Sequence, residues 1–160
     1  NFVIILLERM VIMIKKIIIL QGIPASGKST WARQWVSEDP EHRVRFNRDD
    51  IRNMLGVYWV PSREGLINNI YNTFIHDAMI GQYDIVLDNM NLNKKTLDEI
   101  EKEVRDFNKL PTNFEYQIEY KSFLDTPLEV CIERDSKRES PIGEKTIRSI
   151  YARYKDQYNL

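Results

Sequence analysis

The residues best suited to chemistry form one glycine-rich segment, GIPASGKST, at positions 22–30. The segment matches the pattern G-x-x-x-x-G-K-[ST], whose glycines let the backbone approach a phosphate closely while its amides donate to the phosphate oxygens. Lys28 adds a positive charge that can reach the outer phosphates of a nucleotide, and the Ser29 hydroxyl is a suitable ligand for Mg²⁺. We therefore predict a nucleotide-phosphate site formed by Gly22, Gly27, Lys28, Ser29 and Thr30.

A second group of candidate residues lies in NRDDIR, at positions 47–52. Transfer of a phosphoryl group to a hydroxyl needs a side chain that accepts the hydroxyl proton, and Asp49 and Asp50 are both candidates. Either carboxylate could instead cap the helix that follows, and for Asp50 we favour the cap. Arg52 lies one helical turn beyond Asp49, so it can share the face of Asp49 and bind a phosphate on the acceptor.

A third acidic candidate, Asp88, ends the apolar segment DIVLD at positions 84–88. Its position suits a carboxylate that holds Mg²⁺ or the waters around it. The asparagines that follow it leave open the alternative that Asp88 is a helix cap or a turn residue. We assign Ser29 and Asp88 as candidate metal ligands.

Two arginines, Arg134 and Arg138, lie four residues apart in the polar segment RDSKRESPIG, at positions 134–143. From a helix end or a loop, residues with this spacing can reach the same site. Guanidinium groups stabilise the negative charge that spreads over a transferring phosphoryl group. Basic runs are more often solvated surface, but Pro141 and Gly143 favour a loop, and we predict that this segment is a basic lid.

These residues have to be positioned by an alternation of strands and helices. The apolar run at 17–20 is typical of a strand that is buried on both faces. Apolar residues at helical spacing along 62–79, Leu66 and Phe74 among them, predict a buried helix face. We predict strands at 17–20, 44–47, 84–89 and 114–123, and helices at about 28–36, 50–55, 62–79, 93–108, from 126–127 onward, and 144–158. This order predicts an α/β fold of the P-loop NTPase class, adenylate-kinase-like, with a parallel sheet flanked by helices and ligands beyond the carboxyl ends of the strands.

The chain resembles the 5′-kinase domain of the bacteriophage-type polynucleotide kinase family. The resemblance runs from about Met13 to the end of the chain, and NRDDIR together with the arginine pair is its most specific part. It is carried by GIPASGKSTWAR at 22–33, NRDDIR at 47–52, MNLN at 90–93, DTPLEVCIERDSKR at 125–138 and IRSIYARY at 147–154. The resemblance implies transfer of the γ-phosphate of ATP, with Mg²⁺, to the 5′-hydroxyl end of RNA or DNA.

The resemblance also implies roles for the candidate residues. Lys28 and Ser29 would hold the donor and its metal, and Asp49 would be the general base. Arg52 would bind the phosphate beside the terminal nucleoside of the acceptor. Arg138 would contact the donor phosphates from the lid, with support from Arg134. The expected catalytic residues are Asp49, Lys28 and Arg138, and the expected ATP-binding residues are Gly22, Gly27, Lys28, Ser29, Thr30, Arg134 and Arg138.

The sequence departs from the family in two respects and is compatible with two rival functions. No D-x-D-G-T signature is present in the sequence, so we expect no 3′-phosphatase activity, and the segment 55–65 differs from the family in length and composition. One rival is a small-molecule P-loop kinase that acts on a sugar, nucleoside or antibiotic hydroxyl. The other is a non-catalytic nucleotide-binding regulator, against which the acid and arginine of NRDDIR argue.

Composition places few further limits on these hypotheses. The chain has 160 residues, 42% of them hydrophobic and 29% charged, as expected for one globular domain. A net charge of −1 does not indicate a nucleic-acid partner, although a local basic patch is compatible with one. The single cysteine, Cys131, excludes an internal disulfide, and we expect it to pack in a helix of a cytoplasmic protein.

The chain begins with a strongly apolar stretch, NFVIILLERMVI, followed by further apolar residues. Charged residues interrupt this stretch, so it has no uncharged run that could span a bilayer, and its flanks differ from those of a secretory signal. We expect residues 1–12 to be a non-native extension, residues 13–160 to form the P-loop kinase domain, and the protein to have no membrane partner. A functional anchor, an extra strand or an oligomer contact is the alternative for the extension.

Overall fold

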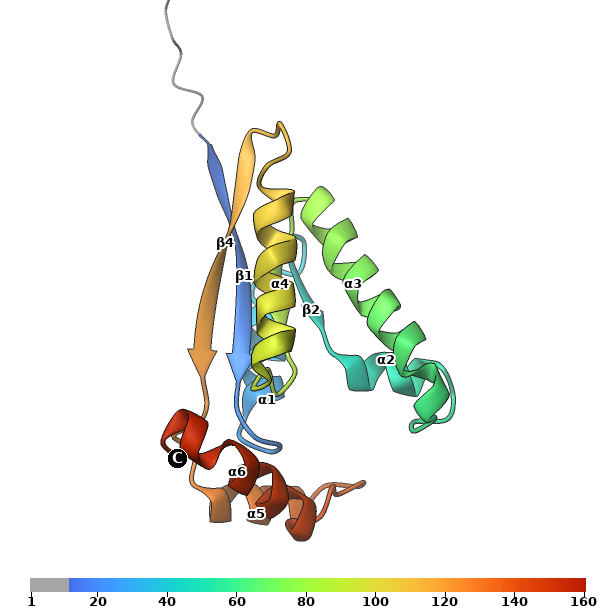
Figure 1. Ribbon diagram of the computed structural model, residues 1–160, viewed down its shortest axis with the longest axis vertical. Coiled ribbons are helices and arrows are strands. Elements are labelled where there is room, and N and C mark those ends of the chain that lie inside the picture. The colour runs from blue at the N-terminus through green and yellow to red at the C-terminus, as the bar shows by residue number, and fades with distance from the viewer. Residues whose placement is uncertain (1–11) are drawn as a thin grey trace, which may run out of the picture.

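The computed structural model describes residues 12–160 (Figure 1). The prediction of an N-terminal extension at residues 1–12 therefore lies outside the described residues, apart from Ile12. Within the described part of the chain, no helix is both long enough and apolar enough to cross a bilayer.

A four-stranded parallel sheet forms the centre of the fold, with the strand order β2-β3-β1-β4. Its strands are β1 (Met13–Gln21), β2 (Arg43–Phe46), β3 (Asp84–Leu87) and β4 (Phe114–Ser122). In the register, Ile17 of β1 lies between Ile85 of β3 and Ile118 of β4. The predicted α/β fold with a parallel sheet is confirmed, and all four predicted strands are present.

The described residues contain six α-helices and one short 3₁₀ helix, of which the last two α-helices follow the last strand and the others connect the strands. They are α1 (Lys28–Ser37), α2 (Arg48–Met54), the 3₁₀ helix η1 (Pro61–Arg63), α3 (Glu64–Ile80), α4 (Lys94–Phe107), α5 (Leu128–Ser136) and α6 (Glu144–Tyr158). The prediction that the third helix begins at Ser62 is wrong, since Ser62 lies in η1 and α3 begins at Glu64. Leu66 and Phe74 are 50% and 38% exposed, so the buried face of α3 is narrower than the apolar spacing predicted.

Both faces of the sheet are covered, which explains the continuous apolar run in β1. Ile17 and Ile19 point into the largest core cluster, which includes buried residues of α3 and α4. Ile18 and Leu20 point the other way and pack with Ala32 of α1. Because successive side chains of a strand alternate between faces, every position of this run is buried.

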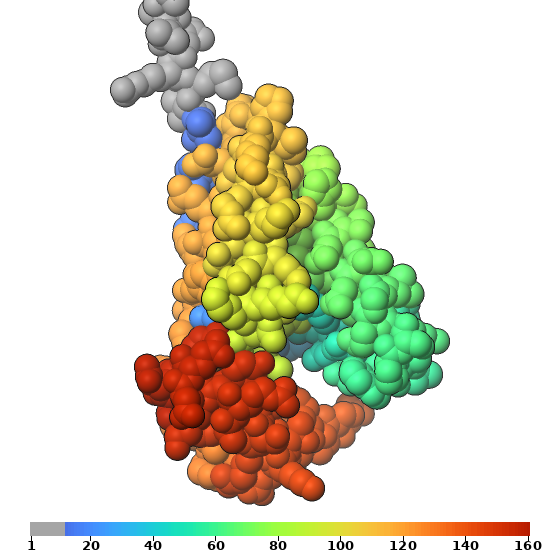
Figure 2. Space-filling model, viewed as in Figure 1, coloured from blue at the N-terminus to red at the C-terminus, as the bar shows by residue number. Residues whose placement is uncertain are grey.

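A separate cluster attaches α5 and α6 at the carboxyl ends of β1 and β4 (Figure 1). Its buried members include Ile23 and Leu92 from the loops after the strands, Cys131 from α5 and Ile147 from α6. The prediction that Cys131 packs in a helix is confirmed. On the other side of this edge lie α2 and the start of α3, and Figure 2 shows a hollow between them and the α5–α6 layer.

Candidate active site

The glycine-rich segment folds into a loop that closes around the ammonium group of Lys28. Lys28 Nζ donates to the carbonyl oxygens of Gly22 and Ile23, both at 2.8 Å, and lies 3.3 Å from Ser26 Oγ. Gly27 has a φ of +106°, which side chains rarely tolerate, at the position that caps α1. A Cβ atom on Gly22 would lie 2.6 Å from Ser26 Oγ and 3.1 Å from Phe123 Cβ, so a side chain at this position would crowd both neighbours.

Burial changes the acid–base behaviour of Lys28. Its side chain is only 7% exposed, and this burial lowers its pKa from 10.5 to about 8, although the nearby Asp88 carboxylate acts in the opposite direction. A second negative group beside the ammonium, such as a phosphate, would favour its charged form. The loop is therefore a site whose charge responds to an anionic ligand.

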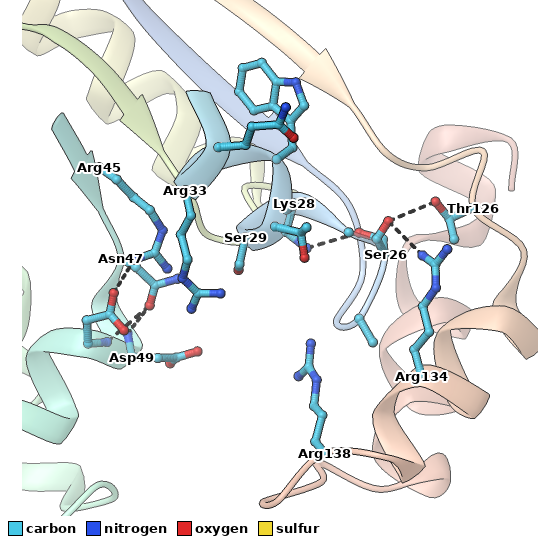
Figure 3. Close-up of a pocket in the computed structure, with 16 residues that line it drawn as sticks. Ser26, Lys28, Ser29, Arg33, Arg45, Asn47, Asp49, Thr126, Arg134 and Arg138 are labelled. Atoms are coloured by element: carbon cyan, nitrogen blue, oxygen red, sulfur yellow. Dashed lines mark hydrogen bonds and ion pairs between the residues drawn. The ribbon is translucent and has the colours of Figure 1, made fainter. Parts of the chain in front are cut away.

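A cavity of about 830 Å³ opens in front of this loop, at the carboxyl edge of the sheet (Figure 3). This size lies within the range of small-molecule sites. The cavity brings together the start of α1, the acids of α2 and the arginines of α5 and the loop after it. Its lining includes Gly27, Lys28, Ser29, Thr30, Asp49, Asp50, Arg134 and Arg138. Figure 3 shows Asp49 and Arg138 extending into the cavity from opposite walls.

Asp49 and Asp50 are not the caps of α2, and the prediction that Asp50 caps this helix is wrong. Asn47 has an extended backbone, and its Oδ1 accepts the backbone N–H groups of Asp49 at 2.7 Å and Asp50 at 3.2 Å. One asparagine therefore performs the capping, which leaves both carboxylates available for other contacts. Asp50 uses its carboxylate to bind Arg45.

Arg52 contacts Asp49, as their helical spacing predicted, but it does not line the large cavity. Its Nη1 donates to Asp49 Oδ1 at 2.6 Å, while Nε and Nη2 donate to the two carboxylate oxygens of Glu64 at 2.9 and 2.7 Å. The hydrogen bonds that Arg52 donates to Glu64 raise the pKa of Arg52, so the guanidinium is always charged. Arg52 and Asp49 both line a second, smaller cavity of about 230 Å³, which also contains Asn93 and Tyr154.

Asp88 lies at the end of β3 and is almost completely buried. Its Oδ2 accepts a hydrogen bond from Arg45 Nε at 2.7 Å, and its Oδ1 has no hydrogen-bond partner among the described residues. Asp88 is not among the residues that line the large cavity, whereas Ser29 is. The alternative that Asp88 caps the next helix is wrong, because Asn93 caps α4 by accepting the N–H of Thr96 at 3.2 Å.

The lid begins later than the sequence predicted, because α5 continues to Ser136 and includes Arg134. Arg134 Nη1 lies 3.5 Å from the carbonyl oxygen of Ser26, so this arginine touches the glycine-rich loop. Arg138 follows the helix end. The buried carboxylate of Asp135 accepts the N–H of Gly143 at 2.8 Å and lies 3.6 Å from Arg138 Nη1, which ties the two ends of the lid together.

Several residues of the site were not identified from the sequence. Arg33 and Arg45 also line the large cavity (Figure 3), where Arg45 is paired with the carboxylates of Asp50 and Asp88. Arg33 lies four residues after Ser29 on α1, and Arg45 lies two residues before Asn47 along the direction of β2. The periods of a helix and a strand could therefore have indicated both. No helix or strand period indicated Asp135, because the backbone N–H groups that it accepts belong to Ile142 and Gly143 in the loop after α5.

Comparison with known families gives a match over almost the whole described chain. The model of the family AAA_33, described as an AAA domain, matches residues 17–158. The matched range includes the glycine-rich loop, the acids of α2 and the lid.

Individual relatives are identical to the chain at about a quarter of the aligned positions. An L-seryl-tRNA(Sec) kinase from Methanococcus maripaludis is 26% identical over 144 residues, which are 86% of this chain and 52% of that kinase. A chain in the structure of the Pnkp1/Rnl/Hen1 RNA repair complex is 25% identical with a TM-score of 0.73, over 91% of this chain and 46% of that one. A chain in another structure of the Pnkp1/Rnl/Hen1 complex is 27% identical with a TM-score of 0.64, over 75% of this chain and 38% of that one. The chain thus spans about half the length of this tRNA kinase and less than half of each of the two chains from the repair complexes.

Proposed function

The chain belongs to the AAA_33 family of AAA domains and has a P-loop kinase fold, and from that premise we propose that it transfers the γ-phosphate of ATP to the 5′-hydroxyl end of RNA or DNA. The observation that carries the proposal is the pairing of opposite chemistries across one cavity. Asp49 enters from α2, whereas Arg134 and Arg138 enter from the lid side, with Lys28 between them (Figure 3). A module that only binds a nucleotide has no use for an acid opposite its phosphate site.

On the donor side, the phosphates of ATP would bind the loop amides and the N-terminus of α1. Lys28 would exchange its carbonyl partners in the loop for phosphate oxygens. Arg134 and Arg138 would stabilise the charge on the transferring group, which is a large part of catalysis in phosphoryl transfer.

Magnesium fits the residues present. The Ser29 hydroxyl lines the cavity, and the buried Asp88 Oδ1 is an oxygen without a partner among the described residues. Hydroxyl and carboxylate oxygens are the ligands that Mg²⁺ prefers, and Mg²⁺ usually keeps several waters and substrate oxygens. Ser29 would bind the ion and Asp88 would orient its waters, and the ion when bound would neutralise charge on the phosphates.

On the acceptor side, Asp49 would accept the proton of the 5′-hydroxyl. The hydroxyl oxygen forms a bond to the γ-phosphorus while the bond from that phosphorus to the β–γ bridging oxygen breaks, and ADP leaves. In a loose transition state the proton leaves only as the new bond develops, so an ionised carboxylate is sufficient as the base. Arg52, beside Asp49 in the smaller cavity, would bind a phosphate of the acceptor.

A polynucleotide acceptor is supported by the surroundings of Asp49 and by the relatives. Trp59 is 60% exposed, and its ring lies 5.8 Å from the Arg52 guanidinium, where it can stack on a base. Both kinds of relative are named for RNA, either as a tRNA kinase or as an RNA repair complex. The tRNA kinase favours a second candidate, in which the hydroxyl belongs to an amino acid attached to tRNA.

The test is transfer of labelled γ-phosphate from ATP with Mg²⁺ to RNA and DNA oligonucleotides that carry a 5′-hydroxyl. Matched 5′-phosphorylated strands, seryl-tRNA and small alcohols serve as the other acceptors. We expect label only on the 5′-hydroxyl strands. Asp49→Ala should reduce transfer by at least about 100-fold, as for loss of a general base, while ATP still binds. Label on seryl-tRNA or a small alcohol instead would exclude the 5′-end proposal, and full activity of Asp49→Ala would exclude Asp49 as the base.

A further inference from the structure

The carboxylate of Asp49 is held by two donors that bind the same oxygen. The hydroxyl of Tyr58 donates to Asp49 Oδ1 at 2.8 Å, and Arg52 Nη1 donates to it at 2.6 Å. Asp49 Oδ2 has no hydrogen-bond partner in the part of the chain that the structure describes. The two oxygens of the carboxylate are therefore different, with one fixed and one available.

The two donors reach Asp49 from outside the large cavity. Asp49 lines both cavities, but Tyr58 is not found among the described residues that line either of them. Arg52 lines only the smaller cavity, and its guanidinium is anchored by the bidentate contact with Glu64. Neither donor lines the large cavity, and the oxygen of Asp49 that they leave without a partner is available to a reacting group.

Tyr58 is itself held in place and remains a donor. Partial burial and the hydrogen bond to Asp49 raise the pKa of Tyr58, so its hydroxyl keeps its proton. Its ring lies 5.8 Å from the Arg52 guanidinium. The loop that carries Tyr58 is fixed near its start, because Arg63 Nη1 donates to the carbonyl oxygen of Leu55 at 3.1 Å.

We propose that Tyr58 is a positioning residue, which together with Arg52 fixes Asp49 through Oδ1 so that Oδ2 receives the acceptor proton. The proposal rests on the proposed role of Asp49 as the general base. A single hydrogen bond would leave the carboxylate free to turn about its last side-chain bond, whereas two donors on one oxygen restrict that rotation. Catalysis depends on such restriction, because small errors in the position of a reacting group reduce the rate strongly.

The experiment compares Tyr58→Phe with the unchanged protein in transfer to a 5′-hydroxyl oligonucleotide. Phenylalanine keeps the ring beside Arg52 and removes only the hydroxyl. We expect kcat to fall by about tenfold, which converts to about 1.4 kcal/mol, with the KM values for ATP and acceptor unchanged. Tyr83→Phe is the matched control, since Tyr83 is exposed just before β3, at the opposite end of that strand from the site. Its kcat should equal that of the unchanged protein.

A second measurement tests the contact without depending on transfer. Urea unfolding should show that Tyr58→Phe lowers the midpoint in the unchanged background but not in the Asp49→Ala background, because the hydrogen bond exists only in the first. An unchanged kcat, or a higher acceptor KM with an unchanged kcat, would overturn the positioning role while the proposed function stands. If the unchanged protein phosphorylates no acceptor, the proposed function fails. Independently of that, if Tyr58→Phe shifts the urea midpoint equally in the unchanged and the Asp49→Ala backgrounds, the contact between Tyr58 and Asp49 is overturned.

Discussion

Nucleotide binding is expected to take up a proton at Lys28 when the pH is alkaline. Burial lowers the pKa of Lys28 from 10.5 to about 8 in the nucleotide-free protein. A phosphate beside the ammonium favours the charged form and raises this pKa again. Lys28 is therefore charged below pH 8 in both states, but above pH 8 the free protein has lost a proton that the complex keeps. Binding is strongest below pH 8 and weakens as the pH rises.

The size of the effect follows from the titration of one group. With a pKa of about 8, the neutral fraction of Lys28 is about 0.1 at pH 7, about 0.5 at pH 8 and about 0.8 at pH 8.5. These fractions are the numbers of protons taken up on binding, as long as Lys28 stays charged in the complex. The dissociation constant should rise by nearly tenfold for each pH unit above about 9.

The assay is titration calorimetry with ATP in two buffers of different ionisation enthalpy, at pH 7 and at pH 8.5. The last phosphate proton of ATP is mostly lost below pH 7, so its release on binding lowers the net uptake at pH 7 and does not contribute at pH 8.5, where burial also raises the pKa of the Cys131 thiol. Lys28→Arg is the control, because a guanidinium does not lose its proton in this range. The assignment to Lys28 would be refuted if the unchanged protein took up the same number of protons at both pH values. It would also be refuted if Lys28→Arg took up as many protons as the unchanged protein at pH 8.5.

Two further substitutions test the acceptor side and the metal site separately. Trp59→Ala should raise the KM for single-stranded acceptors by at least about fivefold, since stacking of one base on an aromatic ring contributes about 1–3 kcal/mol. A blunt duplex acceptor should be unaffected, and an equal loss for both acceptors would argue against stacking. Asp88→Asn should raise the Mg²⁺ concentration needed for half-maximal transfer, with Mg²⁺-free nucleotide binding unchanged. An unchanged Mg²⁺ dependence would mean that Asp88 serves only as the partner of Arg45.

The sheet and the phosphate loop could be predicted because their signals are local. A strand buried on both faces leaves a continuous apolar run, and the glycine-rich pattern requires only eight consecutive residues. The last helix, α6, has the predicted bounds, 144–158. An element whose sequence pattern lies within a few neighbouring residues can be predicted without knowing which distant residues it contacts.

The cap of α2 could not be chosen from the sequence, because it depends on a strand that lies about forty residues away. The segment NRDD offers three residues that can cap a helix, Asn47, Asp49 and Asp50. Asn47 is selected because its side-chain amide also donates to the carbonyl oxygen of Asp88, and the backbone N–H of Arg48 donates to Asn89 Oδ1. These contacts join the ends of β2 and β3, which become neighbours only in the folded sheet.

Arg52 has fewer free donors for an acceptor phosphate than its helical spacing from Asp49 indicates. A guanidinium carries five N–H donors, and Arg52 uses one on Nε and one on Nη2 for Glu64 and one on Nη1 for Asp49. Glu64 occupies the bidentate arrangement that an arginine offers to a phosphate. An acceptor phosphate must therefore bind the two remaining N–H groups or displace Glu64. Since Glu64 begins α3 and Tyr58 lies in the loop before it, we infer that acceptor preference depends on residues 55–64 and not on the glycine-rich loop.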